Sequence, residues 1–346
     1  MKERTAQPPD SPVAQPTPVT NALTIDVEDY FHVSAFEAVC DPCTWEEREC
    51  RVEANTARVL ELLSAADTRA TFFVLGWVAA RFPRLAREIA AAGHEVACHG
   101  YAHRRVCTQT REEFREDLGR SKALLEDQTG SPVRGYRAPS YSIGPTCLWA
   151  FDELAEAGFA YDSSVFPVRH DLYGLSDWPR HAFWLERLKG EAGQANWVPA
   201  QDGAAPAGVG EPRDAATRPP EPAGQHGHRL LEVPITTLSL LGRNVPIAGG
   251  GYFRLFPYGF THWGLRRINR EERMPFVFYL HPWELDPDQP RMEGAGLKSR
   301  FRHYVNLHRT ESRFRRLLDD FRFAPLRDVL AGSIFPHPRP GHGGLS

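Results

Sequence analysis

The chain has 346 residues, of which 42% are hydrophobic, 11% aromatic and 25% charged, and its formal net charge is −3. This composition is that of a folded protein with enough apolar residues for a sizeable buried core. A chain so close to neutrality lacks the positive surplus that drives phosphate binding, and we therefore expect no nucleic-acid partner.

Both ends of the chain read as flexible. Residues 1–20 are rich in Pro, Gln and Thr and lack the uninterrupted apolar core of a signal peptide. No later stretch reaches the ~20 apolar residues that cross a bilayer. We expect residues 1–20 to be disordered, residues 336–346 to form a flexible tail, and the protein to be soluble and cytoplasmic.

The predicted elements alternate along the chain. In order they are a strand at 22–27, a helix at 53–66, a strand at 70–77, a helix at 83–93, a strand at 94–100, a helix at 111–127, a strand at 133–137, a helix at 146–157, strands at 159–164 and 231–236, a helix at 258–269 and a strand at 275–283. This order is typical of parallel βαβ units, which close economically as a barrel or as a doubly wound sheet. We favour an α/β fold of the distorted (β/α) barrel type, with about seven parallel strands, over residues 21–335.

One internal segment departs from this pattern. Residues 190–229 are rich in Ala, Gly, Pro, Gln and Glu and contain few large apolar side chains. Such a stretch buries too little surface to offset its ordering entropy, so we predict a disordered insertion.

The six cysteines do not indicate a disulfide framework in a chain of this length, and reduced thiols are expected. Cys40 and Cys43 form a CxxC pair with Cys50 nearby, which is compatible with a zinc or redox motif. A second CxxC pair at matching distance is absent from the sequence, so ordinary thiols near a loop are the favoured interpretation.

Carboxylates gather at the end of the first predicted strand. Asp26, Glu28 and Asp29 lie within four residues, at the carboxyl end of a strand where parallel α/β folds place their active sites. Their mutual repulsion requires a cation or a raised pKa. The alternative is a solvated acidic loop that caps the next helix.

A pair of histidines follows the third predicted strand. His99 and His103, at positions i and i+4, would share one face of a helical turn and could meet one Zn²⁺ ion. Histidines at this spacing are also common on surfaces. One carboxylate and two histidines from separate strand ends make the open, three-ligand site of a hydrolytic metal centre, so the joint occurrence favours a metal.

Other strand ends carry further candidates. Arg137 could orient a carboxylate, with Pro139 stiffening its loop, or it could be a surface arginine before a turn. His281, beside Trp283, could be a general acid or a histidine that is hydrogen-bonded to a backbone carbonyl. Asp162 either lines the mouth of the active site or caps a helix. The run Gly249–Gly251, followed by Tyr252, permits a sharp loop. A structural role is the favoured interpretation of this loop, and contact with the substrate is the alternative.

In chain order, these segments resemble the NodB-type polysaccharide deacetylases of carbohydrate esterase family 4. The segments DVEDYFHVSAF, RAPSYS, GGGYFR and LHPWE look most like the deacetylases encoded with bacterial exopolysaccharide and exosortase systems, which carry a C-terminal extension. The broad family has two adjacent aspartates in its first motif, whereas Val27 follows Asp26 here. Glu28 and Asp29 therefore both stay open as the acidic metal ligand.

The resemblance implies a metal-dependent hydrolysis of N-acetyl groups from the amino sugars of a polysaccharide, in exopolysaccharide biosynthesis and in association with the synthesis machinery. It implies Zn²⁺ or another divalent ion on His99, His103 and one carboxylate, Asp26 as base oriented by Arg137, and His281 as acid. Two alternatives remain: hydrolysis of another amide, such as a cyclic imide or ureide, on the same barrel, and a catalytically inactive carbohydrate-binding homologue.

Overall fold

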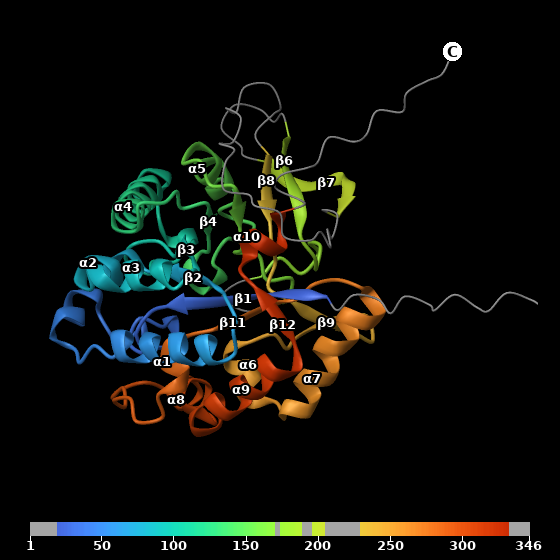
Figure 1. Cartoon of the computed structure of the whole chain (residues 1–346). Coiled ribbons are helices and arrows are strands. Elements are labelled where there is room, and N and C mark those ends of the chain that lie inside the picture. The colour runs from blue at the N-terminus through green and yellow to red at the C-terminus, as the bar shows by residue number, and fades with distance from the viewer. Residues whose placement is uncertain (1–18, 170–173, 189–195, 205–228, 332–346) are drawn as a thin grey trace, which may run out of the picture.

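The computed structural model describes residues 19–169, 174–188, 196–204 and 229–331 (Figure 1). Its centre is a ten-stranded sheet in which parallel pairing dominates. The parallel strands lie in the spatial order β11 (Val277–Leu280), β1 (Thr20–Val27), β2 (Thr71–Val74), β3 (Glu95–Cys98), β4 (Gly135–Tyr136), β5 (Tyr161–Asp162) and β8 (Arg229–Glu232), and β12 (Arg322–Ala324) also pairs with β1.

The predicted fold class is confirmed, because every strand from β11 to β8 in this series overlaps a segment predicted as a strand. The ladder runs from β11 to β7 in the described part of the chain without closing on itself, which makes the barrel a distorted one.

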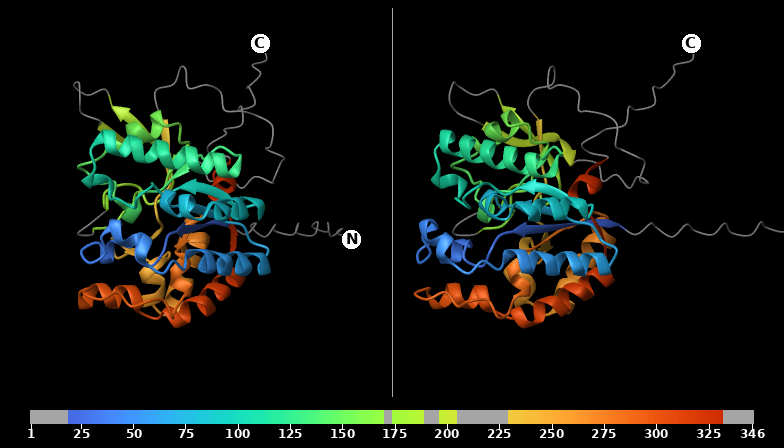
Figure 2. Two further views of the ribbon diagram at one scale, coloured as in Figure 1. Left: turned by 90° about the vertical axis from the view of Figure 1, so that its left-hand side faces the viewer. Right: turned by 60° about the vertical axis from the view of Figure 1, so that its left-hand side comes forward.

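Helices cover the outside of the sheet. Figure 1 shows α5, α4, α3, α1 and α9 following one another around it, and Figure 2 shows the orange and red helices of the C-terminal part below the blue strand β1. The helices are α1 (Val52–Ala65), α2 (Gly76–Arg81), α3 (Pro83–Ala91), α4 (Arg111–Thr129), α5 (Ala150–Glu156), α6 (Gly250–Leu255), α7 (Tyr258–Arg267), α8 (Leu297–Tyr304), α9 (Thr310–Asp320) and α10 (Leu326–Val329). None of the helices among the described residues is both long and apolar enough to cross a membrane.

Short helical turns follow several strands and carry site residues. They are η1 (Ser34–Phe36), η2 (Pro42–Glu47), η3 (Val106–Thr108), η4 (Pro139–Tyr141), η5 (Ile268–Glu272), η6 (Pro282–Leu285) and η7 (Leu307–Arg309).

The antiparallel part of the sheet differs from the sequence prediction. β6 (Phe183–Leu188) pairs with β8 on one side and with β7 (Asn196–Ala204) on the other, and β9 (Thr237–Leu240) and β10 (Arg243–Pro246) form a separate hairpin. The strand β7 lies inside the segment 190–229 that was predicted to be disordered. Its Trp197 is buried against Phe151 and donates a hydrogen bond to Asp152, so one large aromatic side chain anchors it.

The rest of that insertion, residues 190–195 and 205–228, lies outside the described residues, as do residues 1–18 of the predicted N-terminal segment and the predicted tail at 336–346. Thr20, by contrast, already belongs to β1.

The first strand shows why the site forms at one edge of the sheet. Residues Asn21 to Val27 of β1 are buried, as expected for a parallel strand covered on both faces. Side chains alternate along a strand, so Ile25 and Val27 enter the main hydrophobic core while Thr24 and Asp26 face the other side. Because neighbouring strands are parallel, their carboxyl ends bring residues from β1, β3, β4, β5 and β11 together there.

Candidate active site

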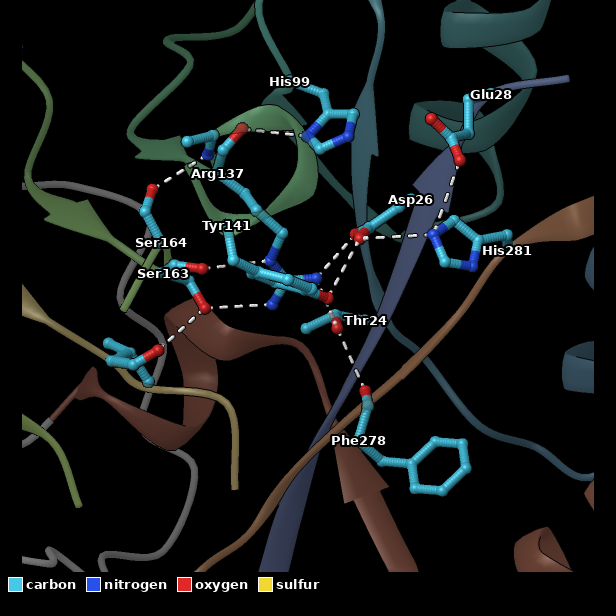
Figure 3. Close-up of polar contacts among 12 residues, drawn as sticks. Thr24, Asp26, Glu28, His99, Arg137, Tyr141, Ser163, Ser164, Phe278 and His281 are labelled. Carbon is cyan, nitrogen blue, oxygen red and sulfur yellow. Dashed lines mark hydrogen bonds and ion pairs between the residues drawn. The ribbon is translucent and has the colours of Figure 1, made fainter. Parts of the chain in front are cut away.

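Asp26 and Arg137 form a buried ion pair at the carboxyl ends of β1 and β4 (Figure 3). Nη1 of Arg137 donates to Oδ1 of Asp26 at 2.6 Å, and the two side chains are 0% and 2% exposed. The other carboxylate oxygen of Asp26 lies 3.5 Å from the hydroxyl of Tyr141 and 4.0 Å from Nε2 of His281. One oxygen of Asp26 is therefore fixed by Arg137, and the second faces the remaining site residues.

Several groups fix the guanidinium of Arg137 in turn. Its Nη1 also donates to Oγ1 of Thr24, and its Nε and Nη2 donate to the carbonyl and hydroxyl oxygens of Ser163. The guanidinium carbon lies 4.1 Å from the ring centroid of Phe73, a cation–π contact. With its donors and one face occupied, Arg137 holds Asp26 in a single orientation.

Glu28, His99 and His103 lie together as a group that could hold a metal ion; the sequence predicted both histidines and left Glu28 and Asp29 open as the carboxylate. One ligand atom of each lies within 4.8 Å of the other two, and this is the one such cluster of three or more potential ligands in the residues that the structure describes. Oε2 of Glu28 is 2.6 Å from Nε2 of His103, yet it has no hydrogen bond although it is buried. Two imidazole nitrogens and a carboxylate oxygen suit a divalent ion, and the residues present fit one.

The protonation of these groups supports the same interpretation. Burial disfavours the carboxylate of Glu28, but the positive charges of His103 and His281 outweigh this effect and lower the pKa of Glu28. Burial lowers the pKa of His99 to about 4. Because the carbonyl of Arg137 can only accept, Nδ1 of His99 donates to it at 2.8 Å and leaves Nε2 as a ligand. Ligands must be deprotonated, and the lowered pKa values of Glu28 and His99 favour their deprotonated forms.

The histidines converge in a different way from the one predicted. Residues 99–103 are not helical. The chain turns instead, with positive φ at Gly100 (70°) and His103 (50°), and the carboxylate of Asp117 on α4 accepts hydrogen bonds from the backbone amides of Tyr101 and Ala102. A turn held by Asp117 therefore brings the imidazoles to a centroid distance of 5.5 Å.

Asp29, the second candidate for the acidic ligand, is not part of this cluster. Its carboxylate accepts hydrogen bonds from the backbone amides of Tyr30, Arg51 and Val52, and the last of these is the first residue of α1. Asp29 therefore caps the start of α1, as in the alternative interpretation of the acidic stretch, but it is buried and not solvated.

Asp162 also lies away from the cluster. It accepts hydrogen bonds from the amide and hydroxyl of Ser164, whose hydroxyl accepts from the amide of Ala138. Asp162 thus stabilises, through Ser164, the backbone next to Arg137, and it does not line the mouth of the active site. Burial raises the pKa of Asp162, and burial beside that carboxyl raises the pKa of Glu232 as well.

His281 stands at the end of β11 and faces both carboxylates of the site. Its Nε2 is 3.5 Å from Glu28, and Nδ1 is 2.7 Å from Oε1 of Glu284, whose other oxygen accepts from Nε of Arg254 at 2.6 Å. Burial lowers the pKa of His281, but the hydrogen bond that its Nδ1 donates to Glu284 and the charge of Glu28 outweigh this effect and raise the pKa to about 9. Trp283 stacks on His281 and its indole donates to Glu28.

The backbone conformation and packing at the remaining loop candidates are consistent with structural roles. Pro139 is the first residue of η4, where Ser140 and Tyr141 both have positive φ (55° and 53°). Tyr252, on α6, stacks on Phe256 and packs against a core cluster. Gly249 has φ 129°, and a Cβ there would lie 2.0 Å from the carbonyl oxygen of Tyr279. No side chain fits at this distance from the carbonyl oxygen, so position 249 requires glycine.

The Cys40 and Cys43 pair is not a metal cluster in the described residues. Cys40 is buried beside Phe31 and Phe36 in a small aromatic core, while Cys43 is exposed in η2. All six cysteines are free thiols.

Sequence reasoning missed several residues of the site. Thr24, Tyr141, Ser163, Glu284 and Arg254 were not assigned roles. The period of two along β1 could have paired Thr24 with Asp26, and the i+3 spacing could have paired Glu284 with His281. Arg254 reaches Glu284 across 30 residues of chain, and no spacing signal marks that contact.

Comparison with known proteins connects this site to one enzyme family. Residues 43–159 match the family model "Polysaccharide deacetylase", and residues 206–331 match "Domain of unknown function (DUF3473)". The first match contains His99, His103 and Arg137; the second contains His281, Glu284 and Arg254.

Two curated relatives and one solved structure are similar to this chain. It is 32% identical over 118 residues to the peptidoglycan deacetylase of Helicobacter pylori and 30% identical over 99 residues to a peptidoglycan-N-acetylglucosamine deacetylase of Bacillus cereus. These alignments cover 33% and 28% of this chain, and only 38% and 36% of those relatives. A putative polysaccharide deacetylase from Mycobacterium smegmatis has the same fold, with a TM-score of 0.51, 94% of both chains covered and 20% identity.

Proposed function

We propose that this chain, in which residues 43–159 match the polysaccharide deacetylase family, hydrolyses N-acetyl groups from amino sugars of a polysaccharide with the help of a divalent metal ion. The observation that carries the proposal is the placement of Glu28, His99 and His103 around one point beside the Asp26–Arg137 pair. A three-ligand centre next to an oriented carboxylate is the arrangement of metal-assisted hydrolysis. Zn²⁺ is the proposed ion because the donors are two imidazoles and one carboxylate.

Asp26 is the proposed general base. A divalent ion in such a site supplies polarisation of the acetamide carbonyl and a lowered pKa of water. Asp26 takes the proton from the attacking water through the oxygen that faces Tyr141 and His281, because Arg137 occupies the other oxygen. Arg137 keeps the carboxylate oriented through their ion pair.

His281 is the proposed general acid. Glu284 engages its Nδ1, so the proton on Nε2 points toward Asp26 and Glu28. From there His281 protonates the amine nitrogen as the bond from carbon to nitrogen breaks, which releases acetate and a free amino sugar. The raised pKa keeps this proton in place near neutrality.

The biological substrate is proposed to be a bacterial exopolysaccharide, acted on in association with the synthesis machinery. The motifs of this chain resemble deacetylases of such systems. The C-terminal match, residues 206–331, is the proposed extension of that subfamily, and it supplies both the acid His281 and its supports Glu284 and Arg254. The C-terminal part is therefore an integral component of the proposed site.

Acetate release from N-acetylated oligosaccharides tests the function. Metal-stripped protein is assayed with and without added Zn²⁺, and we expect release only after the metal is restored. Release in neither state, with the oligosaccharide still bound, would indicate a carbohydrate-binding homologue. Hydrolysis of a cyclic imide or ureide but of no acetylated sugar would indicate a different amide as substrate.

A further inference from the structure

Two cysteines that play no part in the proposed reaction lie in contact near the site. Sγ of Cys147 donates to Sγ of Cys107 at 3.1 Å, although the residues are 40 positions apart in the sequence. No other two cysteines in the part of the chain that the structure describes are hydrogen-bonded through their sulfurs, and Cys43 is an exposed thiol in η2. The spacing of Cys107 and Cys147 matches no motif, so their contact could not be predicted from the sequence.

The pair joins two loops that flank the candidate active site. Cys107 lies in η3, four residues after the ligand His103, and Cys147 follows the loop that carries Tyr141. Ser142 connects the two loops: its hydroxyl accepts from the amide of Val106 at 2.9 Å, and its carbonyl accepts from both thiols. A hydrogen bond between the two loops therefore already holds them together next to the two sulfurs.

We propose that Cys107 and Cys147 are a redox-active dithiol that closes to a disulfide by exchange with a low-molecular-weight disulfide such as oxidised glutathione. The thiolate of Cys107 attacks one sulfur of the oxidant, forming a mixed disulfide and releasing one reduced thiol. The thiolate of Cys147 then attacks the sulfur of Cys107, forming the internal bond and releasing the second thiol. The protein loses two protons and two electrons, and the small disulfide is reduced.

The surroundings assign the order of these steps. Cys107 is exposed and meets the oxidant first, whereas Cys147 is buried and lies beside the thiol of Cys107. The hydrogen bond from Cys147 lowers the pKa of Cys107, and the charge of Arg105 acts in the same direction. An accessible thiolate with an adjacent resolving thiol is the arrangement of a reversible redox site.

Closure requires little movement of either loop. A disulfide bond is about 2.05 Å long, so the sulfurs approach by only about 1 Å. The hydrogen bond from Val106 to Ser142 does not involve sulfur and is retained. The disulfide therefore tethers the loop after His103 to the loop of Tyr141 without displacing either, and the closed ring includes α4 and Arg137. The oxidised protein is consequently more resistant to unfolding than the reduced protein.

Peptide mapping of the native protein after incubation with oxidised glutathione tests this inference. We expect a mass about 2 Da below that of the reduced protein, one cross-linked peptide joining Cys107 to Cys147, and a higher Tm that returns to the reduced value with dithiothreitol. Cys43→Ser is the matched control, because it removes an exposed thiol without a sulfur neighbour, and we expect it to oxidise like the wild type.

Trapping the intermediate distinguishes the two thiols. Cys147→Ser is expected to accumulate a glutathione adduct of about 305 Da on Cys107, whereas Cys107→Ser is expected to leave Cys147 unmodified. A persistent adduct on Cys107 of the wild type, or a cross-link that involves another cysteine, would overturn the proposal. Full reactivity of Cys147 in the Cys107→Ser variant would overturn the order of the steps.

Discussion

Glu284 holds His281 from the side that faces away from the proposed reaction. Its Oε1 lies 2.7 Å from Nδ1 of His281, and its Oε2 accepts from Arg254 at 2.6 Å. Glu284 and Arg254 are 0% and 2% exposed, so water does not compete for these contacts. The carboxylate fixes which ring nitrogen of His281 is presented to Asp26 and Glu28.

Replacing Glu284 with Gln is therefore expected to reduce kcat by about 10- to 100-fold, because the amide orients His281 less well and stabilises its protonated form less. Acetate release under saturating substrate measures the effect. Glu61→Gln is the matched control, since that carboxylate is 65% exposed and pairs only with Arg58 on the surface. Equal turnover of the Glu284→Gln variant and the control would show that Glu284 does not position the acid.

Asp26→Asn tests the base. The amide oxygen of Asn can still accept from Arg137, so the fold and the metal site should persist while kcat falls by about 10²- to 10⁴-fold. Metal content and acetate release are measured on the same preparation, with the exposed Asp177→Asn as control. A variant with normal metal content and full turnover would contradict the role of Asp26.

Glu28→Ala and Asp29→Ala separate the two candidate ligands. Glu28→Ala is expected to weaken metal binding by more than about 100-fold, because it removes a direct ligand and not only an outer partner. Asp29→Ala is expected to retain the metal but to lose about 1–2 kcal/mol of stability, since it removes the cap at the start of α1. Metal titration and thermal unfolding distinguish the variants, and the reverse pattern would identify Asp29 as the ligand.

Glu232→Gln tests the buried carboxyl pair. Burial beside Asp162 raises the pKa of Glu232 in the folded protein, so the folded state binds a proton that the unfolded chain releases above pH about 4. The stability contributed by this proton is present at low pH and is lost as pH rises. The difference in unfolding free energy between Glu232→Gln and wild type should shift in favour of the variant between pH 5 and pH 8. A difference that is constant over this range would contradict the raised pKa.

The parallel strands could be predicted from the sequence because each is a short apolar run covered on both faces. β7 could not, since it pairs with β6, a strand that the periodicity did not reveal, and since the buried side chain of Trp197 anchors it in a segment of low apolar content. The low apolar content of residues 190–229 did not indicate β7, in which Trp197 packs against Phe151 of α5.

The alternation of side chains along a strand bears on the choice between Glu28 and Asp29 as the acidic ligand. Side chains of a strand alternate, so Asp26 and Glu28 fall on one side and Val27 enters the core. That argument alone favours Glu28 as the ligand. Val27 stands where the broad family has its second aspartate, and its side chain lies in the core while the carboxylate of Glu28 remains available. The contact between Arg254 and Glu284 and the turn held by Asp117 depend on tertiary packing, which spacing along the sequence does not reveal.

Anomalous diffraction at the zinc edge from crystals of the Zn²⁺-reconstituted protein tests the central claim most directly. The account predicts one strong peak bonded at about 2.0–2.2 Å to a carboxylate oxygen of Glu28, Nε2 of His99 and the imidazole of His103, with Asp26 alongside. A peak elsewhere in the molecule, or fully loaded protein in which His99 and His103 do not share an ion, would contradict it.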